Sequence, residues 1–101
     1  MFYVYVLISL KNEDLYIGFT EDLKRRFKDH NDGFVKTTKP NVPWKLVYYE
    51  SYLNKKDAIK REKQLKNHKA KLDLRDQLRY SLDLERGLAK PGLASQGTVV
   101  K

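Results

Sequence analysis

Glu62 is a carboxylate at a position where the helical pattern predicts an apolar residue. In the predicted helix that begins after Asn54, the face formed by Ala58, Ile59 and Leu65 also carries Glu62, at spacings of three and four residues. An unpaired carboxylate on a buried face costs free energy, so it requires an arginine, hydrogen-bond donors or a cation. The pattern leaves two alternatives open. Glu62 is either a ligand for a divalent cation or a structural residue that reaches water or pairs with an arginine.

Arg26 and His30 lie four residues apart in another predicted helix, at the edge of the face that Leu23 and Phe27 bury. An arginine keeps its positive charge at any physiological pH, so its charge-assisted contact with an anion persists. In a basic helix an arginine is ordinarily solvated, as we expect for the neighbouring Lys24. The spacing leaves both interpretations of Arg26 open.

Tyr5 and Tyr16 occupy the two strands of a predicted β-hairpin. A turn with an even number of residues, centred between Asn12 and Glu13, would place both side chains on one face of the sheet. Gly18 falls on the same face, and a glycine inside a strand leaves open backbone where another group must approach closely. The alternative is that both tyrosines are core residues with their hydroxyls at the rim.

Two strands and a helix in the first third of the chain must position these side chains. Phe2–Leu10 is apolar at nearly every position, which is typical of a strand covered on both faces. Leu15–Phe19 follows a polar turn and is its predicted antiparallel partner. Thr20 is the predicted N-cap of the first helix, and Gly33 is the predicted stop.

The remainder of the folded unit is predicted to contain a surface loop, one strand and two helices. The predicted ranges are 34–43 for the loop, 45–52 for the strand, 54 to about 67 for the next helix and about 69–82 for the last. In the last helix, Leu72, Leu78 and Leu82 are predicted to face inward. The order β-β-α-β-α-α predicts an α/β (α+β) fold, in which helices flank a small three-stranded mixed or antiparallel sheet.

The composition of the 101 residues excludes several classes of site. Hydrophobic residues make up 41% and charged residues 34%, which indicates a globular chain. We expect one domain over residues 1–82 and a flexible tail over 83–101. The absence of cysteine excludes disulfides, thiolate zinc sites and cysteine nucleophiles, and two histidines are too few for a histidine cluster. No apolar run is long enough to span a bilayer, so we expect a cytoplasmic protein without a membrane partner.

The net charge of +8 favours a polyanionic partner, nucleic acid above all. Residues 55–79 contain ten lysines and arginines against four acidic residues. Together with the basic residues of the preceding loop and strand, this stretch is the predicted phosphate-contacting surface. The candidate nucleic-acid-binding residues are Lys36, Lys39, Lys45, Lys55, Lys60, Lys63, Lys66 and Lys69.

The order and spacing of these residues resemble the GIY-YIG nuclease superfamily, in particular its short, single-domain, excinuclease-C-like (UPF0213-like) branch. The resemblance covers about residues 2–70. It rests on Tyr3-Val4-Tyr5, on Tyr16-Ile17-Gly18, on Arg26 ten residues after Tyr16, on His30, on the third strand Trp44–Glu50 and on Glu62. The first motif reads Tyr-Val-Tyr in place of Gly-Ile-Tyr. The asparagine that many larger members carry after the glutamate has no equivalent, because that region reads Leu72-Asp73-Leu74.

The resemblance implies a role for each candidate residue. Glu62 would bind Mg²⁺ or Mn²⁺, for which one carboxylate together with waters and substrate oxygens is sufficient. Arg26 would stabilise the charge of the transition state. Beside Arg26 and the cation, the pKa of Tyr5 is expected to fall below its ordinary value of about 10. Tyr5 would then be the general base and Tyr16 its orienting partner, and His30 could share or replace that role.

The implied function is a divalent-metal-dependent endonuclease that hydrolyses phosphodiester bonds of DNA in repair or recombination, with DNA favoured over RNA. The alternative is a non-catalytic nucleic-acid-binding module of the same fold, since a fold does not by itself determine an activity.

Overall fold

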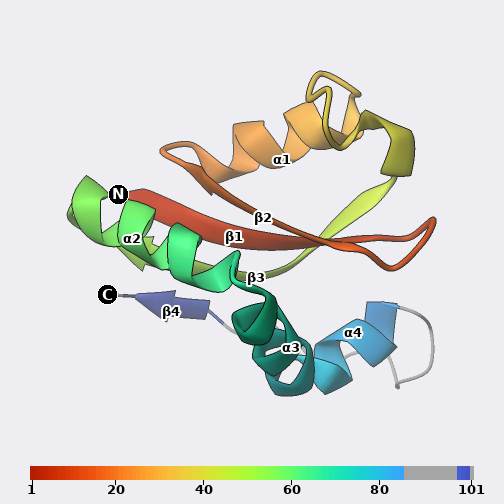
Figure 1. The fold of residues 1–101 in the computed structure, drawn as a ribbon. Helices are drawn as coiled ribbons and strands as arrows, with labels where there is room; N and C mark the ends of the chain where they lie inside the picture. The colour runs from red at the N-terminus through yellow and green to blue at the C-terminus, as the bar shows by residue number, and fades with distance from the viewer. Residues whose placement is uncertain (86–97, 101) are drawn as a thin grey trace.

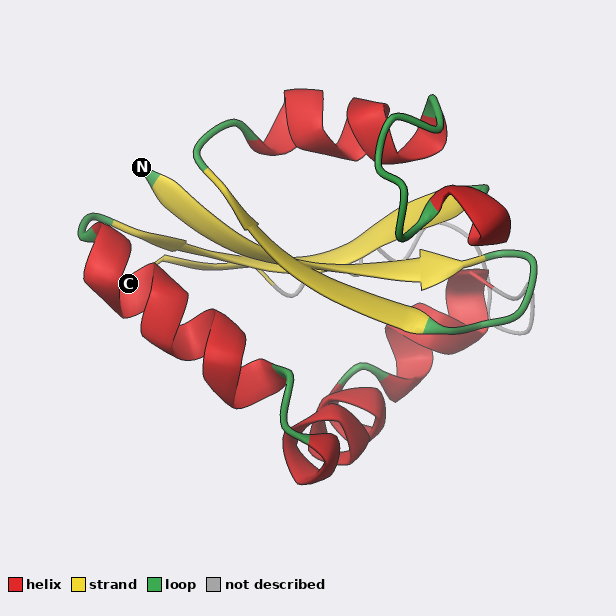
Figure 2. Ribbon diagram, turned by 45° about the horizontal axis from the view of Figure 1, so that its top comes forward, coloured by secondary structure: helices red, strands yellow, loops and turns green. Residues whose placement is uncertain are grey.

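A β-sheet divides the molecule into two layers in the computed structural model, which describes residues 1–85 and 98–100. The strands lie in the order β2 (Leu15–Thr20), β1 (Phe2–Ser9), β3 (Trp44–Tyr52), β4 (Thr98–Val100). Helix α1 (Leu23–Asn31) and the 3₁₀ helix η1 (Lys39–Asn41) lie on one side of the sheet (Figure 1). Helices α2 (Lys55–Leu65), α3 (His68–Gln77) and α4 (Arg79–Glu85) cover the other side, as the nearly edge-on view of Figure 2 shows.

The predicted α+β class and its three-stranded antiparallel sheet are confirmed. Strands β2, β1 and β3 pair antiparallel, and the short β4 adds a parallel edge to β3 that the sequence analysis did not predict. The predicted tail of residues 83–101 falls largely outside the described residues, which include only the end of α4 and β4 of that range. None of the described helices is long and apolar enough to cross a membrane.

Strand β1 is buried on both faces, as its unbroken apolar sequence predicts. Every residue from Val4 to Ser9 is at most 1% exposed. Val4, Val6 and Ile8 point toward α2, α3 and α4 and belong to the larger core cluster. Tyr5 and Leu7 point the opposite way and pack with Trp44 beneath α1. The alternation of a single strand therefore sends one set of side chains to the core and the other set to the candidate site.

Two predicted helix boundaries are wrong, for identifiable reasons. The N-cap of α1 is Asp22, whose carboxylate accepts a hydrogen bond from the Arg25 amide, while the predicted cap, Thr20, accepts one from the Asp22 amide. The predicted last helix is interrupted at Leu78 and forms α3 and α4. Leu74, Leu78 and Leu82 are buried at spacings of four, so Leu72, two residues before this series, is 54% exposed instead of facing inward.

Glu50 is a buried carboxylate that the sequence analysis missed. It is 2% exposed and accepts hydrogen bonds from Arg61 Nε at 2.9 Å, Arg61 Nη2 at 3.0 Å and the Tyr48 hydroxyl at 2.7 Å, and one from the Tyr52 hydroxyl. Burial alone would raise the pKa of Glu50, but the hydrogen bonds from Arg61, Tyr52 and Tyr48 outweigh burial and hold this pKa below its ordinary value. The alternation of Tyr48, Glu50 and Tyr52 along β3 was the available sequence signal.

Replacing Glu50 with glutamine should lower the free energy of unfolding by about 2–3 kcal/mol. The substitution leaves the Arg61 charge without its partner, and the loss falls below the about 3–5 kcal/mol of a fully buried pair because the Arg61 side chain is 34% exposed. Urea unfolding followed by fluorescence measures the difference. The control is Asp32→Asn, the same chemical change at the exposed Lys28–Asp32 pair of α1, for which we expect at most about 0.5 kcal/mol. Equal losses in the two variants would contradict a structural role for the Glu50 network.

Candidate active site

The hairpin register places Tyr5 and Tyr16 on the same face of the sheet, toward α1. Tyr5 pairs with Gly18 and Leu7 with Tyr16, so the turn is centred between Lys11 and Asn12 and not between Asn12 and Glu13 as predicted. The shift moves every pairing by two residues and so preserves the face of each side chain. The two tyrosine rings lie with their centroids 6.3 Å apart. The predicted shared face of the two tyrosines is confirmed, although they are not paired with each other.

Gly18 is required by the Tyr5 ring. A Cβ atom at position 18 would lie 2.4 Å from the Tyr5 hydroxyl oxygen and 2.5 Å from its Cζ. The group that approaches the open backbone is therefore a side chain of the protein itself. This contact fixes the Tyr5 ring against β2.

His30 is the residue that the Tyr5 hydroxyl contacts. It extends from α1 toward the sheet and is 0% exposed, so it is not at the edge of the buried face, where the sequence analysis placed it. Its Nε2 lies 2.7 Å from the Tyr5 hydroxyl, and its Nδ1 lies 2.8 Å from the Thr38 hydroxyl. The Tyr16 ring stands edge-on to the imidazole, with the centroids 4.9 Å apart. Tyr5, Tyr16 and His30 thus form one buried cluster.

The Thr38 hydroxyl determines the direction of the hydrogen bonds through His30. Thr38 donates to the Val35 carbonyl at 3.4 Å, so it accepts from Nδ1–H of the imidazole. A neutral imidazole with its proton on Nδ1 has an acceptor at Nε2, and the Tyr5 hydroxyl donates to it. Thr38 was not a predicted site residue. Its position in the polar sequence Lys36-Thr37-Thr38-Lys39 gave no signal that distinguished it from Thr37.

Burial shifts the pKa values of both members of the Tyr5–His30 pair toward the neutral forms. The pKa of His30 is lowered to about 4, first by burial and then by the positive charge of Arg26, so the imidazole is neutral at pH 7. The pKa of Tyr5 is raised to about 12, chiefly by burial. Arg26 alone therefore does not bring this pKa below its ordinary value, and the part of the expectation that depends on a bound cation stays a prediction. Arg26 does lower it, but less than burial raises it.

Arg26 lies one helical turn before His30 and is half-buried. Its charge acts on both His30 and Tyr5, so the structure brings it to the same cluster. The interpretation of Arg26 as a merely solvated residue is wrong. The neighbouring Arg25 is exposed on the same helix.

Glu62 approaches the cluster from α2, on the opposite layer. Its side chain is 21% exposed, and its carboxylate lies 3.4 Å from Nζ of the more exposed Lys66. The negative charge of Glu62 contributes to the raised pKa of Tyr5, so Glu62 lies within electrostatic reach of the tyrosine. The partly buried arginine of α2, Arg61, pairs with Glu50 and not with Glu62. Glu62 therefore lies at the edge of the apolar stripe, near the cluster and partly open to solvent.

The chemistry of Glu62 fits a hydrated hard cation and no other kind of metal site. Within residues 1–85 and 98–100, no group of three or more His, Cys, Asp or Glu side chains gathers to hold a metal ion. Magnesium needs only one or two carboxylates when waters and substrate oxygens complete its octahedron. Glu62 can supply one such oxygen ligand.

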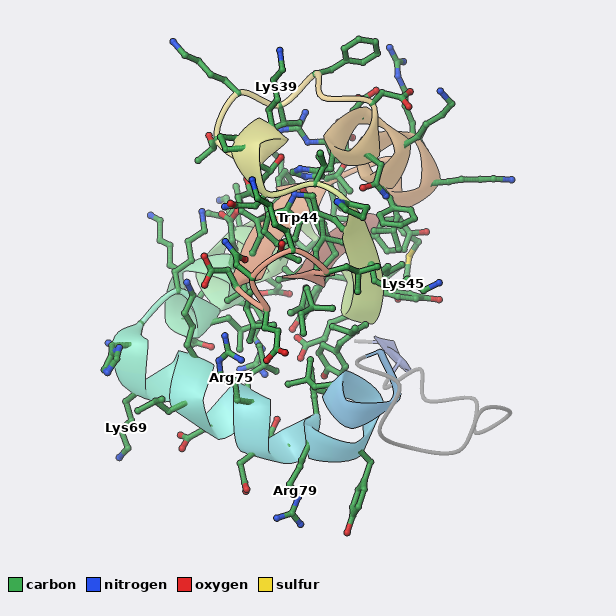
Figure 3. All side chains as sticks on the ribbon, turned by 90° about the vertical axis from the view of Figure 1, so that its right-hand side faces the viewer. Lys39, Trp44, Lys45, Lys69, Arg75 and Arg79 are labelled. Carbon is green, nitrogen blue, oxygen red and sulfur yellow. The ribbon has the colours of Figure 1, made fainter. Side chains whose placement is uncertain are left out.

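The eight lysines predicted to contact nucleic acid are all exposed but do not form a single row. Figure 3 shows Lys39, Lys45 and Lys69 pointing in three different directions. Lys36 and Lys39 belong to the loop on the α1 side, whereas Lys55, Lys60, Lys63 and Lys66 follow α2 and Lys69 lies on α3. The structure therefore spreads this positive charge over both layers.

Replacing Gly18 with alanine should displace Tyr5 from His30. The added Cβ cannot coexist with a buried ring at 2.4 Å, so we expect a loss of about 1–3 kcal/mol in the free energy of unfolding and loss of the Tyr5–His30 contact. Nuclear Overhauser contacts between the two rings measure the displacement. Gly33→Ala is the control. At φ 79° it is strained, but its Cβ would lie 3.7 Å from the nearest side-chain atom, so the Tyr5–His30 contact should survive. Unchanged ring contacts in Gly18→Ala would show that Gly18 does not position Tyr5.

Comparisons with known proteins identify the family of this chain. The model of the GIY-YIG catalytic domain matches residues 1–75. A UPF0213 protein of Clostridium perfringens is 46% identical over 67 residues, which cover 65% of this chain and 71% of the relative. A UPF0213 protein of Bacillus licheniformis is 38% identical over 79 residues, covering 77% and 76% of the two chains.

A protein of solved structure is also similar to this chain. The solution NMR structure of the UPF0213 protein BH0048 from Bacillus halodurans is 32% identical and covers 76% of this chain and 85% of that protein, with a TM-score of 0.48. Tyr5, Tyr16, Arg26, His30 and Glu62 all lie within residues 1–75, the range that the family model matches. The family model and the sequence relatives show that the chain belongs to the GIY-YIG catalytic domain family, and the UPF0213 proteins are its relatives.

Proposed function

We propose that the protein is a divalent-metal-dependent endonuclease that hydrolyses phosphodiester bonds of DNA, in repair or recombination. Membership of the family supports nuclease chemistry on a nucleic acid. The observation that carries the proposal is the buried chain of hydrogen bonds from Tyr5 through His30 to Thr38, with Arg26 beside it. Such a chain can take up a proton at the Tyr5 end, because the imidazole is neutral before the reaction and can accept the Tyr5 proton on Nε2.

Tyr5 and His30 act together as the general base. With a pKa of about 12, Tyr5 is protonated at neutral pH and cannot accept a proton while it keeps its own. The neutral Nε2 of His30, 2.7 Å away, accepts the Tyr5 proton as the Tyr5 oxygen takes one from the attacking water. Thr38 holds the proton on Nδ1, which keeps Nε2 free as the acceptor. Tyr16 packs against the imidazole and keeps its ring in place.

Arg26 and Glu62 provide the charges that the reaction requires. The Arg26 guanidinium stabilises the negative charge that accumulates on the phosphoryl oxygens in the transition state. Glu62 would hold the divalent cation, Mg²⁺ or Mn²⁺. When bound, the cation neutralises phosphoryl charge and assists the departure of the leaving oxygen. The existing Glu62–Lys66 contact is a partly exposed ion pair and is weak enough to give way.

The test is cleavage of a panel of single-stranded, flapped, forked and nicked DNA substrates with Mg²⁺ or Mn²⁺, and with EDTA as the metal-free control. We expect Glu62→Gln and Arg26→Ala each to reduce the cleavage rate by about 10²–10³, with little change in melting temperature, because each removes transition-state stabilisation from a partly exposed position. Asp57→Asn on the exposed side of α2 and Arg25→Ala on α1 are the matched controls and should keep the wild-type rate.

Two results would count against the proposal. Full activity in Glu62→Gln would remove the cation from the mechanism. A melting temperature several degrees lower in that variant, without a metal-dependent shift in the wild type, would make Glu62 a structural residue. Salt-dependent binding of DNA by the wild type without any cleavage would instead favour a non-catalytic nucleic-acid-binding module.

The decrease of kcat/KM at acid pH should reflect the lowered pKa of His30. Below this pKa of about 4, Nε2 carries a proton and cannot accept one from Tyr5, so kcat/KM should rise with pH through about 4 and level off above it. Nitrogen-15 NMR of the imidazole follows the same titration directly and separates it from protonation of Glu62. A His30 titration near its ordinary value of 6.5 would contradict a buried, neutral acceptor.

A further inference from the structure

A polar cleft lies beside the candidate active site and is lined in part by Tyr16 of that site. Its volume is about 330 Å³, and it lies between the β1–β2 hairpin, the loop before β3 and helix α3. Figure 3 looks at this end of the molecule, with Trp44 above Arg75 near the centre of the view. Among the residues that line it are Asp14, Tyr16, Thr38, Trp44, Lys71 and Arg75.

Two residues that contact His30, Tyr16 and Thr38, also line the cleft. The Tyr16 ring packs against His30 on one side, with the centroids 4.9 Å apart, and against Trp44 on the other, at 6.2 Å. Thr38 binds His30 through its hydroxyl and accepts the Trp44 indole N–H on its carbonyl at 2.9 Å. A group bound in the cleft is therefore separated from His30 by one side chain.

The two cations of the cleft lie one helical turn apart on α3 and are half-buried. Arg75 Nη2 donates to the Glu13 carbonyl at 3.0 Å, which fixes the guanidinium at the cleft and leaves most of its donors free. Lys71 forms no ion pair or side-chain hydrogen bond with any residue that the structure describes. The one acidic residue among those that line the cleft, Asp14, is exposed. Figure 3 shows Lys69 and Arg79 pointing outward, whereas Arg75 points toward the sheet.

We infer that this cleft binds the nucleotide next to the scissile phosphodiester, with its phosphate on Lys71 and Arg75. The inference rests on the proposed nuclease function. A half-buried ammonium without a hydrogen-bond or ion-pair partner among the described residues, beside a guanidinium held in place, is suited to a phosphate. The volume is at the lower end of small-molecule sites, so the cleft accommodates one nucleotide and not a duplex. The substrate must therefore carry a charged phosphate adjacent to the one that is cleaved.

Thymidine trinucleotides test this requirement one charge at a time. One substrate carries two phosphodiesters, and the other two carry a neutral methylphosphonate either 5′ or 3′ of the remaining phosphodiester. Binding is measured in EDTA by NMR, with the indole N–H of Trp44 as reporter because it is the one tryptophan of the chain. Cleavage of the same trinucleotides is then measured with Mg²⁺ or Mn²⁺.

We expect the wild type to bind the fully charged trinucleotide about tenfold more tightly than one of the methylphosphonates, with a shift of the Trp44 signal. In Lys71→Gln this preference should fall to near equality. Lys71 has no described structural contact to lose, so the variant should fold. The matched control, Arg25→Gln, removes a charge from an exposed site on α1 and should keep the preference.

Equal binding of all three trinucleotides by the wild type, an unaffected Trp44 signal, or an unchanged preference in Lys71→Gln would each overturn the inference. Failure of the proposed function gives a different result. In that case the trinucleotides bind with the expected preference but are not cleaved with either metal.

Discussion

The burial of β1 between two helical layers is the constraint on which the rest of the structure depends. In a central strand covered on both faces, alternate side chains point into two separate layers, one on each side of the sheet. Val4, Val6 and Ile8 build the apolar core with α2, α3 and α4, while Tyr5 and Leu7 face α1. The cluster of Tyr5, Tyr16 and His30 therefore lies on one side of a strand whose other side supplies much of the apolar core.

The buried imidazole of His30 follows from this constraint. A histidine with no exposure must stay neutral and must satisfy both ring nitrogens, and Tyr5 and Thr38 do so from two different elements. No buried side-chain nitrogen or oxygen of the described residues lacks a hydrogen-bond partner. Because each partner fixes the next, the positions of the hydroxyl, the imidazole and the loop threonine are set before any substrate arrives. Such preorganisation is what an acid–base pair requires.

The sequence was sufficient for what depends on local pattern. Alternation and spacing predicted the strands, the shared face of Tyr5 and Tyr16, and the Asn54 cap of α2. The sequence was insufficient where a tertiary contact determines which of several similar residues joins the site or the core. Thr37 and Thr38 are adjacent and identical in type, but only Thr38 is buried against His30, and Glu50 is a buried acid that Arg61 reaches from α2.

Other departures from the predictions have the same origin. Leu72 is exposed because Leu74, and not Leu72, continues the buried series of Leu78 and Leu82 at spacings of four. The pKa of Tyr5 rises because burial, which a sequence does not state, outweighs the charge of Arg26. Strand β4 pairs with β3 across a long separation in the chain, and no local sequence pattern predicted this pairing.

The Glu50 network also determines how β1 and β3 can pair. In the observed register Glu50 lies opposite Val4, and its neighbour Tyr49 lies opposite Tyr5. A slip of one residue would turn every side chain of β3 to the other face, moving the Glu50 carboxylate away from Arg61 and into the layer of His30. Both layers would then hold an uncompensated polar group. The two polar clusters lie on opposite faces of adjacent strands, and both are satisfied only in the observed register of β1 and β3. A substitution that shifts this register through one cluster would therefore also displace the other.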